Sequence, residues 1–317
     1  MNKEIAPIIL FCYNRVEYLI RTVMALRANE LAEQSQLIIF SDGAKNEKDL
    51  EKVKAVREYI RLIQGFKYIE IHENSINQGL ANSVITGVTK VINRYGKAIV
   101  LEDDLVTSPY FLRFMNEALE RYEQTDKVIS ILGHTIALVE TGKEVYFQRG
   151  AHCWGWATWK RGWDLFESDT DLLISKLDKH MQKSFDYDHV FSFYQMLLDQ
   201  KAGKIDSWAI RWYASAFLNQ KLTLVAGRNL IDHIGTEQGT HISNILHVPE
   251  PLAVTPIRIP ELSPRHDDEV YRIIVESVKN RICRWKRYFN QIKHIIKLCC
   301  PWGMILFYEK KKAIKHK

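Results

Sequence analysis

Val100-Leu101-Glu102-Asp103-Asp104-Leu105 is the stretch that most strongly indicates the fold of this chain. The apolar run that begins at Ala98 is typical of a buried strand, and it ends abruptly in three consecutive carboxylates. A helical pattern begins soon afterwards, near Tyr110. Acids in this position repel one another unless a cation lies among them, and oxygen ligands suit Mg²⁺ or Mn²⁺. A solvated acidic turn is the alternative interpretation.

The residues before this stretch alternate between strand-like and helical patterns. Strands are predicted at 8–11, 37–40, 68–71 and 98–101, with amphipathic helical segments between them. Strands separated by helices of this length imply right-handed parallel crossovers. We therefore predict an α/β fold with a doubly wound, mostly parallel sheet, in which ligands bind beyond the carboxyl ends of the strands.

Polar and small residues follow each predicted strand at its carboxyl end. The segments are Asn14-Arg15, Ser41-Asp42-Gly43, 74–79 and Glu102-Asp103-Asp104. Each alone is also typical of an ordinary turn. Because they succeed one another along the chain, we predict that they converge on a nucleotide site. Neither Gly-x-Gly-x-x-Gly nor Gly-x-x-x-x-Gly-Lys-Ser/Thr occurs, so a diphosphate held through a metal is favoured over a dinucleotide cofactor or a P-loop.

Charge is segregated along the chain. The 317 residues have a formal net charge of +6, yet residues 281–317 carry eleven Lys and Arg against one acid, Glu309. The body before them is mildly acidic, so the overall charge says nothing about its ligands. The length suits one large core with or without an appendage. The five cysteines show no zinc-ligand spacing and favour a reducing compartment, and we recognise no signal peptide or membrane span.

These strand-end motifs resemble those of GT-A-fold glycosyltransferases. They are most similar to bacterial family 2 enzymes, and the Glu-Asp-Asp form of the Asp-x-Asp motif is similar to that of N-acetylglucosaminyltransferase I. The segments 77–83, 154–159 and 206–241 extend the resemblance, which covers roughly residues 5–245. It implies a hexosyl- or N-acetylhexosaminyltransferase that uses a nucleotide-sugar donor with Mn²⁺ or Mg²⁺.

The resemblance also implies roles on the donor side. Asp104 should ligate the metal, Asp103 should lie near the ribose or the metal shell, and Glu102 should lie near the donor sugar. Asp42 should meet the base or ribose, and the Asn14-Arg15 loop should wall the base. The other residues expected to bind the donor are Asn77, Gly79, Ser83 and Arg211, the last with a surface salt bridge as its alternative.

A histidine after the core often completes the metal or diphosphate site in this fold. His241 is our prediction for this ligand, and His233, eight residues earlier, is its competitor. A lone histidine is also compatible with a purely structural role. The sequence does not separate these alternatives.

The second half should bind the acceptor. Trp154 and Trp156 are predicted to stack on sugar rings, although they belong to a group of four tryptophans of which at least two should lie in the core. Inverting transfer needs a general base for the acceptor hydroxyl, and Asp206 is predicted for this role by the resemblance. Its alternative is a helix N-cap, and Glu237 is the next candidate base.

The domain organisation follows from these patterns. Residues 1–248 are predicted to form the GT-A catalytic domain, with a nucleotide-sugar half at 1–125 and an acceptor half at 126–248. A proline-rich arm should follow at 249–266, leaving the catalytic body. Residues 267–317 form a basic tail whose helical pattern runs to about Leu298, with one apolar stripe.

The tail favours binding to an anionic membrane surface, with packing on the body or on a partner subunit as the alternative. We expect no nucleic-acid partner, because no recognition fold accompanies the charge. The sequence thus predicts a metal-dependent, inverting glycosyltransferase on the cytoplasmic face of the cell membrane, acting on a glycan or lipid-linked glycan in surface polysaccharide synthesis. A nucleotidyltransferase on a related sheet and a non-catalytic glycan- or nucleotide-binding relative are the alternatives.

Overall fold

The structure is a computed structural model that describes residues 5–137, 139–235 and 251–299, with the backbone alone described for 284–299. The strands are β1 (Ile8–Cys12), β2 (Gln36–Ser41), β3 (Tyr68–Glu73), β4 (Lys97–Glu102), β5 (Leu105–Thr107), β6 (Val128–Leu132), β7 (Val145–Arg149), β8 (Trp156–Trp159), β9 (Leu222–Ala226) and β10 (Ile231–His233). Eight of them form one sheet in the order β3-β2-β1-β4-β8-β6-β9-β7, and β10 pairs with β5 apart from it. The first four sheet strands are parallel, while β8 is antiparallel to both its neighbours.

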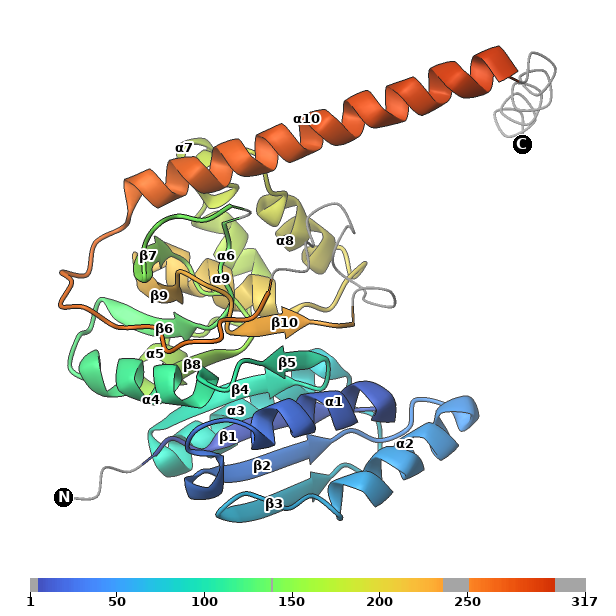
Figure 1. Cartoon of the computed structure of the whole chain (residues 1–317). Coiled ribbons are helices and arrows are strands. Elements are labelled where there is room, and N and C mark those ends of the chain that lie inside the picture. The colour runs from blue at the N-terminus through green and yellow to red at the C-terminus, as the bar shows by residue number, and fades with distance from the viewer. Residues whose placement is uncertain (1–4, 138, 236–250, 300–317) are drawn as a thin grey trace.

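Helices cover both faces of this sheet (Figure 1). They are α1 (Val16–Arg27), α2 (Glu47–Ile60), α3 (Leu80–Tyr95), α4 (Phe111–Arg121), α5 (Lys160–Trp163), α6 (Thr170–Ser175), α7 (Lys179–Phe185), α8 (Phe193–Lys201), α9 (Trp208–Leu218) and α10 (Asp268–Cys299). Alternate residues of β1 enter different cores, because side chains of a strand point to opposite faces. Ile8 and Leu10 pack with α1 and α4, whereas Ile9 and Phe11 pack with α3 and α9. The predicted α/β, doubly wound fold is confirmed.

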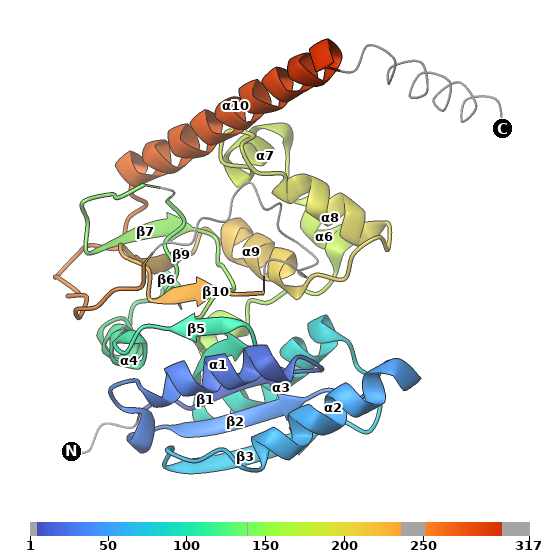
Figure 2. The ribbon, with the colours of Figure 1, turned by 45° about the vertical axis from the view of Figure 1, so that its right-hand side comes forward.

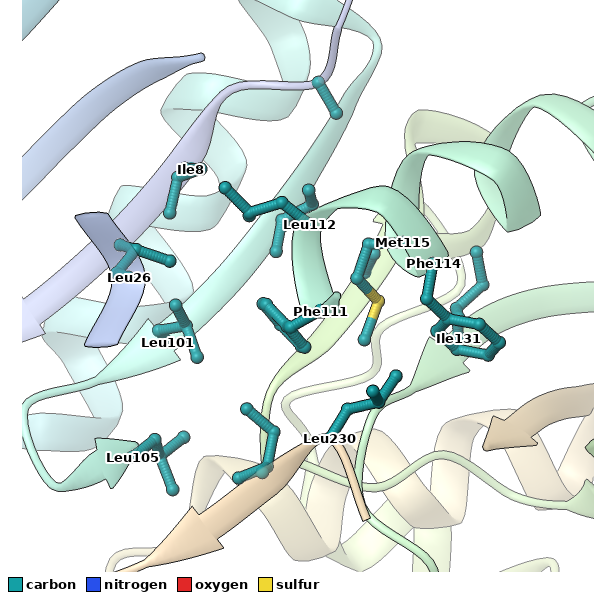
Figure 3. Close-up of a cluster of buried hydrophobic side chains, with 14 of the residues drawn as sticks. Ile8, Leu26, Leu101, Leu105, Phe111, Leu112, Phe114, Met115, Ile131 and Leu230 are labelled. Carbon is teal, nitrogen blue, oxygen red and sulfur yellow. The ribbon is translucent and has the colours of Figure 1, made fainter. Parts of the chain in front are cut away.

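The residues on either side of the three carboxylates are buried in the core on the α4 face of the sheet. Leu101 and Leu105, which flank the three carboxylates, are each 1% exposed. Figure 3 shows these two leucines on one side of Phe111, from α4, with Leu26 of α1 close to Leu101. The turn that carries the acids is therefore anchored by apolar packing before and after it, which fixes where the carboxylates lie.

The segment at 251–267 contains no helix or strand, yet it packs on the body. Ala253, Ile257 and Ile259 are buried in the same core as α4. The Ser108 hydroxyl donates to the carbonyl of Ala253 at 2.6 Å. The proline-rich segment therefore lies against the body of the protein, whereas the sequence predicted that it would leave it.

The beginning of α10 also belongs to the body. Val270, Ile274 and Val275 are buried in the core that contains α3 and α9, and Val278 is buried as well. Further along, α10 extends past α7 and α8 at the end of the molecule opposite β3 (Figures 1 and 2). The tail predicted to start at 267 therefore includes a part that completes the fold. In the described part of the chain, no helix is sufficiently long and apolar to cross a membrane.

Candidate functional site

The carboxyl ends of β1, β2 and β4 open into one cavity of about 1760 Å³. Asn14, Arg15, Asp42 and the acidic cluster, defined as Glu102-Asp103-Asp104, line it from the first half of the chain. The second half supplies the other walls through residues that include His152, Trp154, Phe191, Phe193, Asp206, Tyr213 and His233. The predicted convergence of the strand-end loops therefore agrees with the structure, and both halves of the chain meet at the cavity.

The positive charge among the acids is the guanidinium group of Arg15. Asp103 and Asp104 are only 3% and 5% exposed. The guanidinium of Arg15 forms an ion pair with Asp103, and its Nη2 lies 2.8 Å from Oδ2 of Asp104. The backbone N–H of Tyr13 also donates to Asp103, at 3.3 Å. The Asn14-Arg15 loop was predicted to wall the base, and the structure directs the Arg15 side chain to the acidic cluster.

Burial perturbs the protonation of this cluster. Enclosure by protein, followed by repulsion from Asp104 and Asp103, raises the pKa of Glu102 to about 8. Burial likewise raises the pKa of Asp103 to about 6, although the charge of Arg15 acts in the opposite direction. Additional positive charge in the cavity would favour the ionised forms of both carboxyls. The cluster is therefore suited to receive a cationic ligand.

Asp104 has the features expected of a metal ligand. Its Oδ1 is buried and has no hydrogen-bond partner among the described residues. Its Oδ2 lies 3.7 Å from Nε2 of His233. Gly235 presses against the same carboxylate, because a Cβ there would come within 2.2 Å of Oδ2. One carboxylate and one imidazole fit a hard divalent cation whose other positions are taken by phosphate oxygens or water.

The structure places His233 beside the acids. His241 and Glu237 lie outside the described residues. Within the described part of the chain, no group of three or more His, Cys, Asp or Glu side chains is arranged around a metal position. A metal at Asp104 would therefore rely on His233, on donor oxygens, or on a ligand from the segment that contains His241.

Trp154 and Trp156 have different surroundings. Trp154 lines the cavity and contacts the rings of His134 and His233, with centroid distances of 4.7 and 5.0 Å. Trp156 is 1% exposed and stacks on Trp208 at 5.4 Å in the core. Its prediction as an acceptor-binding residue is corrected, because β8 is a central strand buried on both faces. Trp154 remains available to an acceptor.

Asp42 organises the loop around it. Both carboxylate oxygens accept hydrogen bonds from the loop at 74–79, including those from the Asn77 side chain at 2.9 Å and the Gly79 N–H at 2.9 Å. Gly79 has a φ of +76°, which favours glycine, and it precedes α3. The predicted residues Asp42, Asn77 and Gly79 are thus brought together, and their hydrogen bonds to one another shape the cavity wall.

Ser83 and Asn14 also lie at this wall. The Ser83 hydroxyl, in the first turn of α3, is buried without a hydrogen-bond partner among the described residues. Asn14 donates to Oδ1 of Asp49 at 2.9 Å, so part of its amide is already engaged. Both residues line the cavity, and donor binding by them stays a prediction.

Asp206 lies at the opposite wall, with 66% of its side chain exposed. It does not cap α9, because Ser207 is the N-cap and accepts from the N–H of Ile210. Arg211 donates to Asp206 at 3.1 Å and is not among the residues that line the cavity. Arg211 was predicted to face the diphosphate, and the structure instead supports the salt-bridge alternative.

Several cavity residues carried no signal in the sequence. His152 is a single histidine outside any motif, and burial lowers its pKa to about 4. Its Nε2 has no hydrogen-bond partner among the described residues. Tyr213, whose ring centroid lies 5.4 Å from that of His152, comes from the helix that Ser207 caps. Only the tertiary fold brings these residues to the cavity.

Comparison with known protein families identifies the class of this protein. Residues 8–198 match the model of the family described as glycosyl transferase family 2. The chain belongs to this family. The predicted family resemblance is confirmed, and so is the prediction that the protein is a glycosyltransferase.

Solved structures with a similar fold are distant in sequence. The mannosyltransferase PcManGT from Pyrobaculum calidifontis, solved with GDP-Man and Mn²⁺, is 10% identical, with 68% of this chain and 69% of that chain covered and a TM-score of 0.41. S. aureus TarS 1–349 is 9% identical, with 71% and 59% covered and a TM-score of 0.41. The same fragment with UDP-GlcNAc is 11% identical, with 76% and 62% covered and a TM-score of 0.40. No curated protein matches the chain.

Proposed function

We propose that this protein transfers a hexosyl or N-acetylhexosaminyl group, with inversion at the anomeric carbon, from a nucleoside-diphosphate sugar to a glycan acceptor. The observation that carries the proposal is the acidic cluster, in which Asp103 and Asp104 are buried and which opens into a cavity shared by both halves of the chain. Such a cavity allows a donor and an acceptor to be held together away from water, as group transfer requires.

The donor would lie along the strand ends. Asn14 and Ser83 offer polar groups at the wall that Asp42 shapes, and Glu102 lies at the same wall for the sugar. Asp104, with His233 or His241, would hold Mn²⁺ or Mg²⁺. When bound, that metal supplies charge neutralisation to the departing diphosphate. The unpartnered Oδ1 of Asp104 supports this assignment.

The acceptor would enter from the side of Asp206 and Trp154. The acceptor hydroxyl oxygen forms the new bond to the anomeric carbon while the bond from that carbon to the diphosphate oxygen breaks. The carboxylate of Asp206 receives the hydroxyl proton, and the nucleoside diphosphate leaves with the bonding electrons. The exposed carboxylate of Asp206 and the partly exposed ring of Trp154 support these roles.

The cellular setting is part of the same proposal. The segment after Lys279 is rich in Lys and Arg, and α10 carries its beginning away from the body (Figure 2). Basic segments are attracted to anionic lipid surfaces. The enzyme would therefore work at the cytoplasmic face of the membrane, extending a lipid-linked glycan for a surface polysaccharide.

A donor screen tests the reaction. Incubation of the full chain with a panel of nucleotide sugars and Mn²⁺ should release a nucleoside diphosphate slowly, and release should stop with EDTA. Pyrophosphate as the product would identify a nucleotidyltransferase, and binding without turnover would identify a non-catalytic relative. Asp104→Asn should abolish the EDTA-sensitive release, whereas Asp126→Asn, a change at an exposed acid paired with Lys221, should not.

A further inference from the structure

Arg15 occupies an unusual position for a surface arginine at the start of a helix. It is the N-cap residue of α1, and its side chain turns inward to contact two carboxylates in the turn that follows β4. Its side chain is 27% exposed, whereas the side chains of Asp103 and Asp104 are 4% and 7% exposed. The guanidinium therefore lines the cavity while it contacts the two buried acids.

This position makes Arg15 a competitor for Asp104. The guanidinium engages Oδ2 of Asp104 at 2.8 Å and leaves Oδ1 without a partner among the described residues. A divalent cation at Asp104 would lie close to a fixed positive charge, and like charges at short range in a poorly solvated site repel strongly. Metal binding and the present position of Arg15 therefore oppose each other.

Arg15 would release Asp104 only if another anion received it. The guanidinium lines the cavity, where the proposed donor brings two phosphate groups, and arginine forms bidentate hydrogen bonds with phosphate readily. A diphosphate in the cavity thus provides the alternative partner. In the absence of a diphosphate, the two buried carboxylates retain the guanidinium.

We propose that Arg15 is a positioning residue that makes divalent-cation binding at Asp104 depend on a diphosphate in the cavity. This inference rests on the proposed function, because it takes Asp104 as the metal ligand of a nucleotide-sugar site. Its consequence is that metal and diphosphate bind cooperatively, so the ligand-free protein takes up Mn²⁺ poorly. The coupling is reciprocal, as binding linkage requires.

The experiment measures Mn²⁺ binding to the full chain without nucleotide, by calorimetry and by electron paramagnetic resonance of the free ion. Arg15→Gln should bind Mn²⁺ at least about tenfold more tightly than the wild type, because the competing charge is gone. Arg21→Gln, a change at an exposed arginine on the same helix, should match the wild type. Pyrophosphate should strengthen Mn²⁺ binding more in the wild type than in Arg15→Gln, after correction for the complex that these ions form in solution.

The temperature of thermal unfolding gives a second measure of the competition between Arg15 and the metal. Arg15→Gln leaves two buried carboxylates without their cation, so it should be less stable without metal and should gain more from Mn²⁺ than the wild type gains. If Arg15→Gln does not fold, Arg15→Lys, which keeps the charge but loses the planar contact, should show a smaller increase in Mn²⁺ affinity.

Equal Mn²⁺ affinity in the wild type and in the folded Arg15 variant would overturn the inference. It would also fail if the tighter binding persisted in Arg15→Gln combined with Asp104→Asn, since the ion would then lie elsewhere. Sugar-dependent release of nucleoside diphosphate in EDTA would contradict the metal requirement while leaving transfer intact. Failure of this inference is therefore distinguishable from failure of the proposed reaction.

Discussion

Gly235 lies directly against the carboxylate of Asp104. A Cβ at position 235 would be 2.2 Å from Oδ2 and 3.0 Å from the Cβ of Asp104. The preceding residue, Ile234, donates its N–H to the carbonyl of Asp104 at 2.9 Å, so the two segments cannot separate without loss of that bond. The segment after β10 therefore sets the position of the Asp104 side chain.

Gly235→Ala should displace this carboxylate. We expect turnover of the nucleotide sugar to fall by about 10²-fold or more, because a misplacement of about 1 Å at a reacting site costs this much. The measurement is the rate of nucleoside diphosphate release at saturating Mn²⁺. Gly203→Ala is the control: its φ of +68° strains an alanine, but the added Cβ meets nothing within 4 Å, so this variant loses some stability and should keep its rate. A fully active Gly235→Ala protein would show that Asp104 tolerates displacement.

Asp206→Asn tests the general base. The change keeps the size of the side chain and removes its basicity, so turnover should fall by about 10²-fold or more while donor affinity is retained. Asp206 pairs with Arg211 at 3.1 Å, and Arg211→Met removes that pair without touching the carboxylate. Equal losses of turnover in Asp206→Asn and Arg211→Met would show that transfer needs the ion pair and does not need Asp206 as the general base. Glu237 would then be the next acid to test.

Asp42→Asn should weaken the fold more than a surface change does. The Asp42 carboxylate accepts from the N–H groups of Gly43, Gln78 and Gly79, and an amide nitrogen in its place would face donors. The variant would lose charge-assisted hydrogen bonds and would bury an amide N–H against other donors. Together these changes should lower the free energy of unfolding by about 2–3 kcal/mol. Urea denaturation followed by circular dichroism measures this. Asp171→Asn, at an exposed acid paired with Lys201, should leave the midpoint unchanged.

Two truncations separate the tail from the core. A chain ended after Arg265 loses Val270, Ile274, Val275 and Val278, whose burial contributes roughly 1.5–3 kcal/mol each. That total is comparable with the stability of a whole domain, so this chain should aggregate or unfold. A chain ended after Cys283 keeps these residues and should unfold at nearly the temperature of the full chain.

The full chain and the chain ended after Cys283 also test membrane binding. The full chain should float with liposomes that contain anionic lipid, less so at high salt, and the chain ended after Cys283 should not. Flotation of the shortened chain would assign the lipid contact to the body. Absence of flotation in the full chain would refute the proposed membrane contact.

The elements of the first half were predictable because they depend on local patterns. The strands at 8–11, 37–40, 68–71 and 98–101 each lie within an observed strand, and Asn46 caps α2 as its residue type suggests. Helical and strand periodicities are properties of short segments, so a sequence reveals them directly. The strand-end loops then followed from the topology of a parallel sheet.

The partners inside the site were not predictable in this way. Arg15 and Asp103 are 88 residues apart in the sequence, and nothing local indicates that they meet. Trp154 and Trp156 are alike in type, yet the second lies in a central strand and is buried. Ser207, and not Asp206, caps α9, and sequence patterns do not resolve a shift of one residue at a helix end.

The buried start of α10 has a consequence for biosynthesis. Val270 and Ile274 complete the same core as Ile9 and Phe11 of the first strand. During synthesis, the part of this core that α10 covers stays exposed until α10 has left the ribosome. Exposed apolar surface of this kind makes nascent chains prone to aggregation, so chaperone protection is needed during that interval. A premature stop before residue 270 would thus yield a protein without a finished core, however complete its catalytic residues.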